Sequence, residues 1–341
     1  MGVSATIDWM VAAGHPGEDA ALYDTVCAVA RELCPALGIS IPVGKDSMSM
    51  KTTWRDGAGD KSVTAPLSLV ISAFAPVEDV RNTATPQLSN AIDSKLLLLD
   101  LGVGRCRLGG SALAQVYNEM GDEAPDVTTA VALKEFFTLI QTLKRNKQIL
   151  SYHDRSDGGM FVTLCEMMFA SHQGITVYLD ELCERQSPLA VLFNEELGAI
   201  VQIAERHIDE VLKEFRKADI AADVIGSVND EDNLRIVYRG DEILREPRVA
   251  LQRAWSETTF HMQSLRDNPL CAAEEYDRIL DANDQGLHAV LSFEPLPFSI
   301  AGSRPKIAIL REQGINGQVE MAAAFERAGF DAIDVTMTDI L

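Results

Sequence analysis

The sequence lacks the features that define membrane-spanning, zinc-binding and secreted proteins. No apolar run reaches the roughly 18 to 20 residues of a membrane span, and the longest apolar stretch, 66–77, is interrupted by two serines. The six cysteines form no Cys-x-x-Cys pair, which argues against a zinc site and a dense disulfide framework. No basic segment precedes an apolar one at the N-terminus, so secretion is not indicated. We therefore expect a cytoplasmic protein.

Positive charge is also scarce. The chain has 30 Lys and Arg against 51 Asp and Glu, which gives a formal net charge of −21. Nucleic acids and anionic membranes are bound largely through Lys and Arg, so neither is expected as a partner. In contrast, 47% of the residues are apolar, which is typical of a folded chain, and the 341 residues suffice for two domains at about 100 to 200 residues each.

The first part of the chain is predicted to combine one helix with short strands. Apolar residues of 22–33 recur with helical spacing, and Pro35 is expected to end that helix. The predicted strands are 39–43, 47–53 and 68–74. The glycines of 56–59 are typical of a tight connection between strands, and the polar stretch 82–93 predicts a domain boundary near residue 88.

The second part, 89–280, is predicted to be an α+β domain. It begins with a strand at 95–101, whose four consecutive leucines indicate burial on both faces of a sheet. The predicted helices are 111–120, 131–145, 160–170, 208–217 and 251–265, and the later strands are 175–179, 222–228 and 234–238.

The last part of the chain has a different pattern. Three prolines and two glycines in 281–305 predict a linker, assigned to 281–304. A strand at 306–310, a helix at 318–328 and a strand at 332–335 then predict one βαβ unit. Units below about 40 residues rarely fold alone, so we expect 305–341 to be the start of a larger domain that the chain cuts short.

Lys45 lies in a segment, Gly44-Lys45-Asp46-Ser47, that resembles part of a Walker A loop. The match is incomplete because the upstream glycine is one position too far away and an aspartate replaces the hydroxyl residue that binds Mg²⁺. Glycine, lysine, carboxylate and hydroxyl together would still suit a phosphate and a metal ion. The alternative is a solvated turn in which Lys45 pairs with Asp46, a pair that stabilises the fold very little.

A glycine-rich loop precedes the helix predicted from Ser111. Its glycines are at positions 102, 104, 109 and 110. Backbone N–H groups of such a loop can bind an anion, so Gly109 and Gly110 are candidate phosphate contacts. The spacing differs from the Gly-x-Gly-x-x-Gly of dinucleotide folds, and the alternative is that Ser111 only caps its helix.

The strongest candidate site is the segment 152–159, YHDRSDGG, at the start of a predicted helix. Two carboxylates, Arg155 as a phosphate donor, a hydroxyl and a glycine pair are what a magnesium-bridged phosphate requires. Alternatively, Ser156 or Asp157 caps the helix and the histidine is a satisfied buried imidazole, and for Asp157 we favour capping. Asp154 is too far from the helix to cap it, so it is the preferred metal ligand.

The acidic segment 193–198 leaves two interpretations open. Its carboxylates either join the same cleft or form a solvated turn. No cysteine occupies a Gly-x-Cys-x-Gly turn, and Cys165 falls within a predicted amphipathic helix. Covalent catalysis is therefore not supported, and no catalytic residue is predicted.

Four segments together resemble one enzyme family. They are 42–51 (PVGKDSMSMK), 108–117 (LGGSALAQVY), 153–159 (HDRSDGG) and 311–316 (REQGIN). The family is that of the long, single-chain formylglycinamide ribonucleotide amidotransferases, or phosphoribosylformylglycinamidine synthases, and the resemblance spans essentially the whole chain. It implies a glutamine-dependent carbon–nitrogen ligase of purine biosynthesis, which converts formylglycinamide ribonucleotide, glutamine and ATP to formylglycinamidine ribonucleotide, glutamate, ADP and phosphate.

The resemblance also implies a domain organisation for an internal fragment of such an enzyme. Residues 1–88 would be the end of the second amino-type domain of an aminoimidazole ribonucleotide synthetase-like fold, and 89–280 its carboxy-type α/β domain. After the linker, 305–341 would begin a class I glutaminase domain of flavodoxin-like fold. The first synthetase half and the rest of the glutaminase, with its cysteine, would be missing partners. The fragment alone is therefore expected neither to hydrolyse glutamine nor to make the amidine.

The same resemblance assigns residues to an auxiliary site that holds Mg-ADP structurally. The metal-binding aspartate of the family falls on Asp154 and the nucleotide-contacting serine on Ser156, while the other metal ligands would precede Met1. Lys45, Gly109 and Gly110 complete the candidate nucleotide contacts, and the expected cofactors are Mg²⁺ and ATP or ADP. Two alternatives remain: a non-catalytic nucleotide-holding or interaction module, and a free-standing kinase or synthetase of the same superfamily, against which the tail argues.

Overall fold

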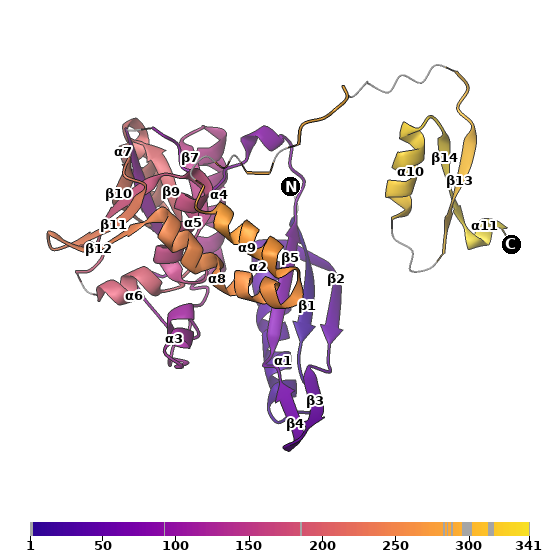
Figure 1. The fold of residues 1–341 in the computed structure, drawn as a ribbon, viewed down its shortest axis with the longest axis horizontal. Coiled ribbons are helices and arrows are strands. Elements are labelled where there is room, and N and C mark those ends of the chain that lie inside the picture. The colour runs from indigo at the N-terminus through magenta and orange to yellow at the C-terminus, as the bar shows by residue number, and fades with distance from the viewer. Residues whose placement is uncertain are drawn as a thin grey trace. The chain divides into compact units, whose positions relative to one another are not determined.

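The computed structural model describes residues 3–91, 93–184, 186–281, 284, 286–287, 289–294, 302–312 and 317–340. The chain divides into two units, Met1–Ala282 and Asn283–Leu341 (Figure 1). Within the described ranges, no helix combines the length and the apolar character needed to cross a membrane.

A three-stranded sheet opens the first unit, with β1 (Val3–Met10) at its centre. β1 runs parallel to β2 (Ile39–Ser47) and antiparallel to β5 (Ser68–Phe74). Alternate residues of β1 are buried, at 2% exposure for Ala5 and Ile7, as expected for a strand with one covered face. The prediction of a loop around Lys45 is wrong, because β2 continues through this segment and Lys45 lies in register with Asp8 of β1.

The predicted first helix is confirmed but is longer than expected. It comprises α1 (Glu18–Val26), the π-helical η1 (Cys27–Leu33) and α2 (Cys34–Leu37). Pro35 does not end it, because the proline stands in the first turn of α2, where its missing N–H has little cost. The helix ends instead at Gly38, whose φ of 77° is the left-handed conformation that glycine tolerates.

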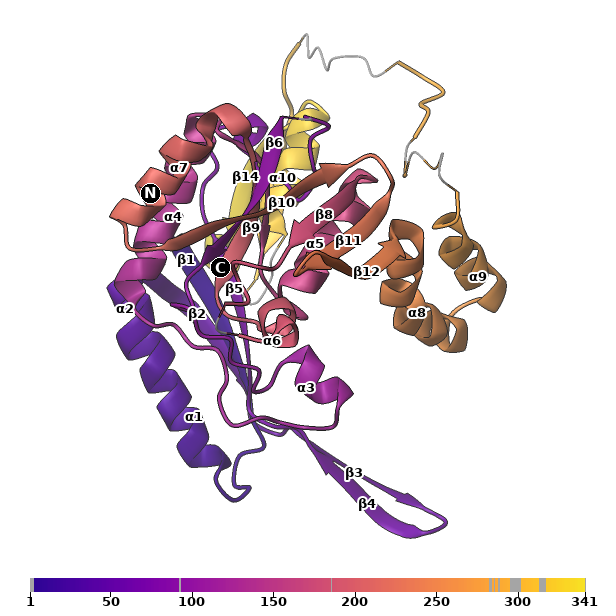
Figure 2. The same ribbon diagram turned by 90° about the vertical axis from the view of Figure 1, so that its left-hand side faces the viewer.

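The tight connection predicted at 56–59 is confirmed. It joins β3 (Lys51–Asp56) to β4 (Gly59–Thr64), which pair only with each other among the described residues. This ribbon extends away from the neighbouring strands in Figure 2. A short turn of helix, η2 (Val80–Asn82), precedes the second part of this unit, which begins with β6.

A mixed seven-stranded sheet forms the centre of that second part, in the order β12-β11-β8-β10-β6-β9-β7. Its strands are β6 (Ser94–Asp100), β7 (Ile149–Asp154), β8 (Gly174–Tyr178), β9 (Gly198–Ala204), β10 (Ala221–Asn229), β11 (Asn233–Tyr238) and β12 (Asp241–Pro247). The leucines of β6 are at most 4% exposed, and they alternate between two core clusters, one on each face. Burial of this strand on both faces is therefore confirmed.

Helices cover both faces of the sheet (Figure 2). α4 (Ala130–Arg145) and α7 (Ile208–Lys217) pack on the face of Leu97 and Leu99, whereas α5 (Gly159–Ser171) and α6 (Pro188–Phe193) pack on the other. The other helical elements are α3 (Ala112–Val116), η3 (Glu205–His207), α8 (Arg248–Arg266) and α9 (Pro269–Arg278). The α+β class is thus confirmed.

The second unit contains the predicted βαβ element. β13 (Lys306–Arg311) and β14 (Asp331–Thr336) are parallel and connected through α10 (Gln318–Arg327), and α11 (Met337–Ile340) follows. The predicted linker 281–304 lies partly outside the described residues, as does 313–316 of the fourth motif.

Candidate functional site

The loop between β7 and α5 separates exposed polar groups from a buried arginine. Asp154, Ser156 and Asp157 are exposed, whereas Arg155 is only 6% exposed. The backbone therefore presents a carboxylate and a hydroxyl to solvent at the start of a 13-residue helix. Such a position is favourable for an anion or for a metal-bridged phosphate.

Arg155 connects this loop to the ends of two strands. Its Nη2 donates to the Asp100 carboxylate at the end of β6 and, over 3.0 Å, to the carbonyl of Leu197, and its Nε donates to the Glu196 carbonyl. The expectation that Arg155 donates to a phosphate is therefore wrong, because its guanidinium is already used inside the protein. Its role here is to fix the loop.

Glu196 forms a second buried ion pair. Its carboxylate is completely buried and accepts from Arg107 Nε at 2.7 Å and Nη2 at 2.8 Å. Burial by itself would raise the pKa of Glu196, but the hydrogen bonds from Arg107 outweigh burial, so the pKa lies below its ordinary value. The bidentate geometry holds the Arg107 loop against the turn after α6.

Glu195 bridges two helix N-termini. Its Oε1 accepts from the backbone N–H of Gly158, before α5, and from that of Ala112, at the start of α3, both at 2.8 Å. The solvated-turn interpretation of 193–198 is thus wrong, since both glutamates accept hydrogen bonds from the chain itself. Capping of α5 by Asp157 is also wrong: the N-cap is Gly158, without a side-chain cap of its own.

The glycine loop uses its amides internally. Gly109 N–H donates to the Glu123 carbonyl and Gly110 N–H to the Met120 carbonyl, each at 2.7 Å. A Cβ on Gly109 would lie 2.4 Å from the Glu123 oxygen, whereas Gly110 adjoins open space. The capping interpretation of Ser111 is confirmed, because its Oγ accepts from the N–H of Ala114. The predicted nucleotide contacts of Gly109 and Gly110 stay predictions.

The structure brings four of the five predicted site residues into one region. Glu195 joins the loop of Asp154 and Ser156 to the loop that follows Gly109 and Gly110. Lys45 is exposed on β2, and among the described interactions none joins it to Asp46 or to these loops. The predicted pairing of Lys45 with Asp46 is therefore not observed.

Two neighbours of Asp154 complete the local network. Tyr152 donates its hydroxyl to Asp154 Oδ1 at 2.5 Å, and burial together with this hydrogen bond raises the pKa of Tyr152. His153 Nε2 lies 2.7 Å from Glu166 Oε2. The interpretation of His153 as a satisfied imidazole is confirmed, although its side chain is 22% exposed.

The side chains around Asp154 could bind Mg²⁺ only if phosphate oxygens supply further ligands. Across the described ranges, no group of three or more His, Cys, Asp or Glu side chains could hold a metal. Mg²⁺ is commonly bound through one or two carboxylates, with waters and phosphate oxygens as the other ligands. Asp154 therefore fits as the single protein ligand of a nucleotide-bound magnesium, and does not by itself make a free-standing metal site.

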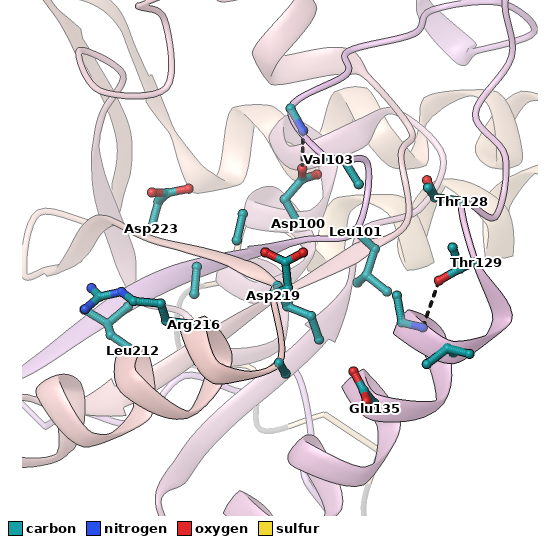
Figure 3. Close-up of a pocket in the computed structure, with 17 residues that line it drawn as sticks. Asp100, Leu101, Val103, Thr128, Thr129, Glu135, Leu212, Arg216, Asp219 and Asp223 are labelled. Carbon is teal, nitrogen blue, oxygen red and sulfur yellow. Dashed lines mark hydrogen bonds between the residues drawn. The ribbon is translucent and has the colours of Figure 1, made fainter.

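A separate cavity of about 800 Å³ lies beside the ends of β6 and β10, between α4 and α7 (Figure 3). Its charged lining is mostly acidic: Asp100, Glu135, Arg216, Asp219 and Asp223. Burial, aided by the charges of Asp100 and Glu181, raises the pKa of Asp223. Such a lining disfavours a phosphate, and none of the five predicted site residues contributes to it.

Three family models match successive parts of the chain. They describe an FGAR-AT PurM_N-like domain over residues 1–76, the C-terminal domain of AIR synthase related proteins over 94–239, and a CobB/CobQ-like glutamine amidotransferase domain over 304–341. The middle match contains six of the seven strands of the large sheet, all but β12, and both loops of the candidate site.

Solved structures from Thermotoga maritima share the fold. PurL complexed with ATP gives a TM-score of 0.53 at 14% identity over 87% of this chain and 40% of that one. PurL complexed with FGAR gives 0.54 at 15% identity over 73% and 39%. Phosphoribosylformylglycinamidine synthase II gives 0.52 at 12% identity over 96% and 44%. This chain thus spans less than half the length of these relatives.

The match over 94–239, which carries the loops of the candidate site, shows that this part of the chain is an AIR synthase-related domain. The flanking matches narrow the class of protein, because one describes an FGAR-AT PurM_N-like domain and the other a glutamine amidotransferase domain. The chain belongs to the formylglycinamide ribonucleotide amidotransferase family.

Proposed function

We propose that the chain is part of a phosphoribosylformylglycinamidine synthase, a ligase that consumes ATP and glutamine to convert formylglycinamide ribonucleotide to its amidine in cytoplasmic purine biosynthesis. The observation that carries the proposal is the order of the three matched domains along one chain. A free-standing kinase or synthetase of the superfamily would not need the glutamine amidotransferase segment at 304–341. The proposed organisation is 1–88, 89–280, a linker at 281–304 and 305–341.

Within this enzyme, we assign the described loops to a nucleotide site. Asp154 would bind Mg²⁺ and Ser156 would contact the nucleotide. Lys45, Gly109 and Gly110 stay candidate contacts, the glycines through close approach of their backbone, because their N–H groups donate to the carbonyls of Glu123 and Met120. The exposure of Asp154 and Ser156 beside the N-terminus of α5 supports this assignment. The complexes of Thermotoga maritima PurL with ATP, AMPPCP and ADP support a nucleotide as the ligand. When bound, Mg²⁺ would neutralise phosphate charge, and the chain's own task is to hold the loops in place.

A thermal melt of the 341-residue chain tests the nucleotide site. Millimolar Mg-ADP is expected to raise the melting temperature, and Asp154→Ala is expected to abolish that shift because the metal loses its protein carboxylate. Asp157→Ala is the matched control, since it removes an exposed carboxylate three residues away that caps nothing, and it should keep the shift. Absence of a shift in the unmodified chain would contradict the proposed site.

The chain alone is expected to release no ammonia from glutamine. Glutaminase chemistry of this type needs a cysteine thiolate. All six cysteines are free, but burial raises the pKa of Cys165 to about 12, and that of Cys106 to about 11 with help from the charge of Asp100. Cys27 and Cys271 lie within helices rather than on a nucleophile turn. Steady-state ammonia production by the purified chain would contradict this expectation.

The raised thiol pKa values and the helical positions of these cysteines also agree with a second candidate function. In it, the chain is a non-catalytic module that holds a nucleotide. The two candidates differ in one measurable respect. A ligase component should restore amidine formation when the missing synthetase and glutaminase parts are supplied, whereas a module with only a holding role should bind Mg-ADP and restore nothing.

A further inference from the structure

Glu195 contacts two segments that are far from it in the sequence. The same oxygen, Oε1, accepts from Ala112 N–H, 83 residues away, and from Gly158 N–H, 37 residues away. Both donors lie at the start of a helix, next to a loop that contains candidate nucleotide residues. One carboxylate thus links these two loops.

The backbone that carries Glu195 is fixed on both sides. On one side, Asn194 is only 2% exposed, and its Nδ2 donates to the carbonyls of Ala190 and Val191 at the end of α6. On the other side, the carboxylate of Glu196 is held by Arg107, and its carbonyl accepts from Arg155. Glu195 therefore projects from a rigid turn rather than from a mobile loop.

The α5 loop approaches this turn as closely as a glycine permits. A Cβ on Gly159 would lie 2.5 Å from the Asn194 oxygen and 2.8 Å from the Leu192 oxygen. The contact between Glu195 and Gly158 is thus part of a close-packed junction. In contrast, Asp154 and Ser156 of the same loop are exposed, and the hydrogen bonds described for Glu195 go to Ala112 and Gly158 instead.

A carboxylate at a helix N-terminus could have either of two roles. It could occupy the position of a phosphate and have to leave before a nucleotide binds, or it could hold the loops while the nucleotide binds elsewhere on them. The second role agrees with the rigid turn, the two donors on one oxygen and the separate exposed face of Asp154 and Ser156.

We propose that Glu195 is a positioning residue, which clamps the Gly109–Ser111 loop to the Asp154–Gly159 loop and so builds the nucleotide site without touching the nucleotide. The proposal rests on the nucleotide site assigned above. It predicts that the loss of Glu195 weakens nucleotide binding, whereas a displaceable phosphate mimic would predict that its loss strengthens binding.

Hydrogen–deuterium exchange of the nucleotide-free chain tests the clamp itself. In Glu195→Ala, the amides of Ala112 and Gly158 lose their acceptor, so peptides that contain them should exchange faster. Glu195→Gln keeps a side-chain oxygen and should retain most of the protection. Unchanged exchange in Glu195→Ala would overturn the clamp, whether or not the chain binds nucleotide.

Titration with Mg-ADP tests the effect on the site. Glu195→Ala is expected to raise the Kd about tenfold, which corresponds to about 1.4 kcal/mol, and Glu195→Gln should stay near the unmodified chain. Glu246→Ala, which removes an exposed carboxylate from β12, controls for the change in net charge. Faster exchange with an unchanged or lower Kd would overturn the positioning role. Failure of the unmodified chain to bind Mg-ADP would instead overturn the proposed function, and the exchange data would still decide on the clamp.

Discussion

At the scale of single residues, the candidate site divides polar side chains that face solvent from those that hold the loops. Asp154 and Ser156 are exposed, whereas Arg155 and Glu196 are buried and paired. The motif 152–159 predicted a cluster of polar groups at the start of a helix, and the structure has such a cluster there, whereas the preference for Asp154 over Asp157 as a metal ligand stays a prediction. The burial of the Arg155 side chain could not be predicted from the sequence, because its partners come from β6 and from the segment before β9.

Substitution of Glu196 should give a pH-dependent loss of stability. Glu196→Gln leaves the partly buried Arg107 with a neutral partner, which should cost about 1–3 kcal/mol at neutral pH. The folded pKa of Glu196 is below its ordinary 4.5, so the ionised pair stabilises the fold above about pH 4.5 and that stabilisation is lost as the pH falls through the lowered value.

Melting curves between pH 3 and pH 7 would measure this dependence. The difference in melting temperature between the unmodified chain and Glu196→Gln should be largest near pH 7 and shrink below pH 4. Glu246→Gln, at an exposed position, should show a small and constant difference. A gap that widens as the pH falls would contradict the assigned role of the pair.

At the scale of elements, strands and helices with strong apolar patterns were predictable. The leucines of β6 and the amphipathic α7 gave clear signals, and both elements lie where the sequence places them. β12 was missed because it is an exposed edge strand with mostly charged residues, paired only with β11. α9 was missed because a proline soon after a helical segment, here 251–265, usually marks the end of a helix, whereas Asn268 and Pro269 are the N-cap and first turn of the next one.

The junction of α5 with the turn after α6 can be tested through its glycine. Gly159 has φ of 66°, and a Cβ there would also collide with backbone atoms of 192–194. Gly104 has a similar φ of 71° but nothing within 4 Å of a Cβ, so it isolates the conformational cost. Gly104→Ala should destabilise by about 1–2 kcal/mol and Gly159→Ala by clearly more. Equal losses in denaturant unfolding would contradict the close packing.

At the scale of the whole molecule, the net charge of −21 repels any anionic ligand. The exposed Asp154 adds negative charge at the site where a nucleotide would bring its own, and the separate cavity is acidic as well. The cavity could not be predicted, because its lining comes from segments scattered between residues 100 and 223. A nucleotide bound by such a chain needs a cation between its phosphates and the protein carboxylate.

The most direct test of this account is a pair of titrations of the 341-residue chain with ADP, one with Mg²⁺ and one with a chelator. The account predicts saturable binding with Mg²⁺ that weakens at least about tenfold, or about 1.4 kcal/mol, when the metal is removed, and no such metal dependence in Asp154→Ala. Equal affinity with and without Mg²⁺ would contradict the assignment of Asp154 as a metal ligand.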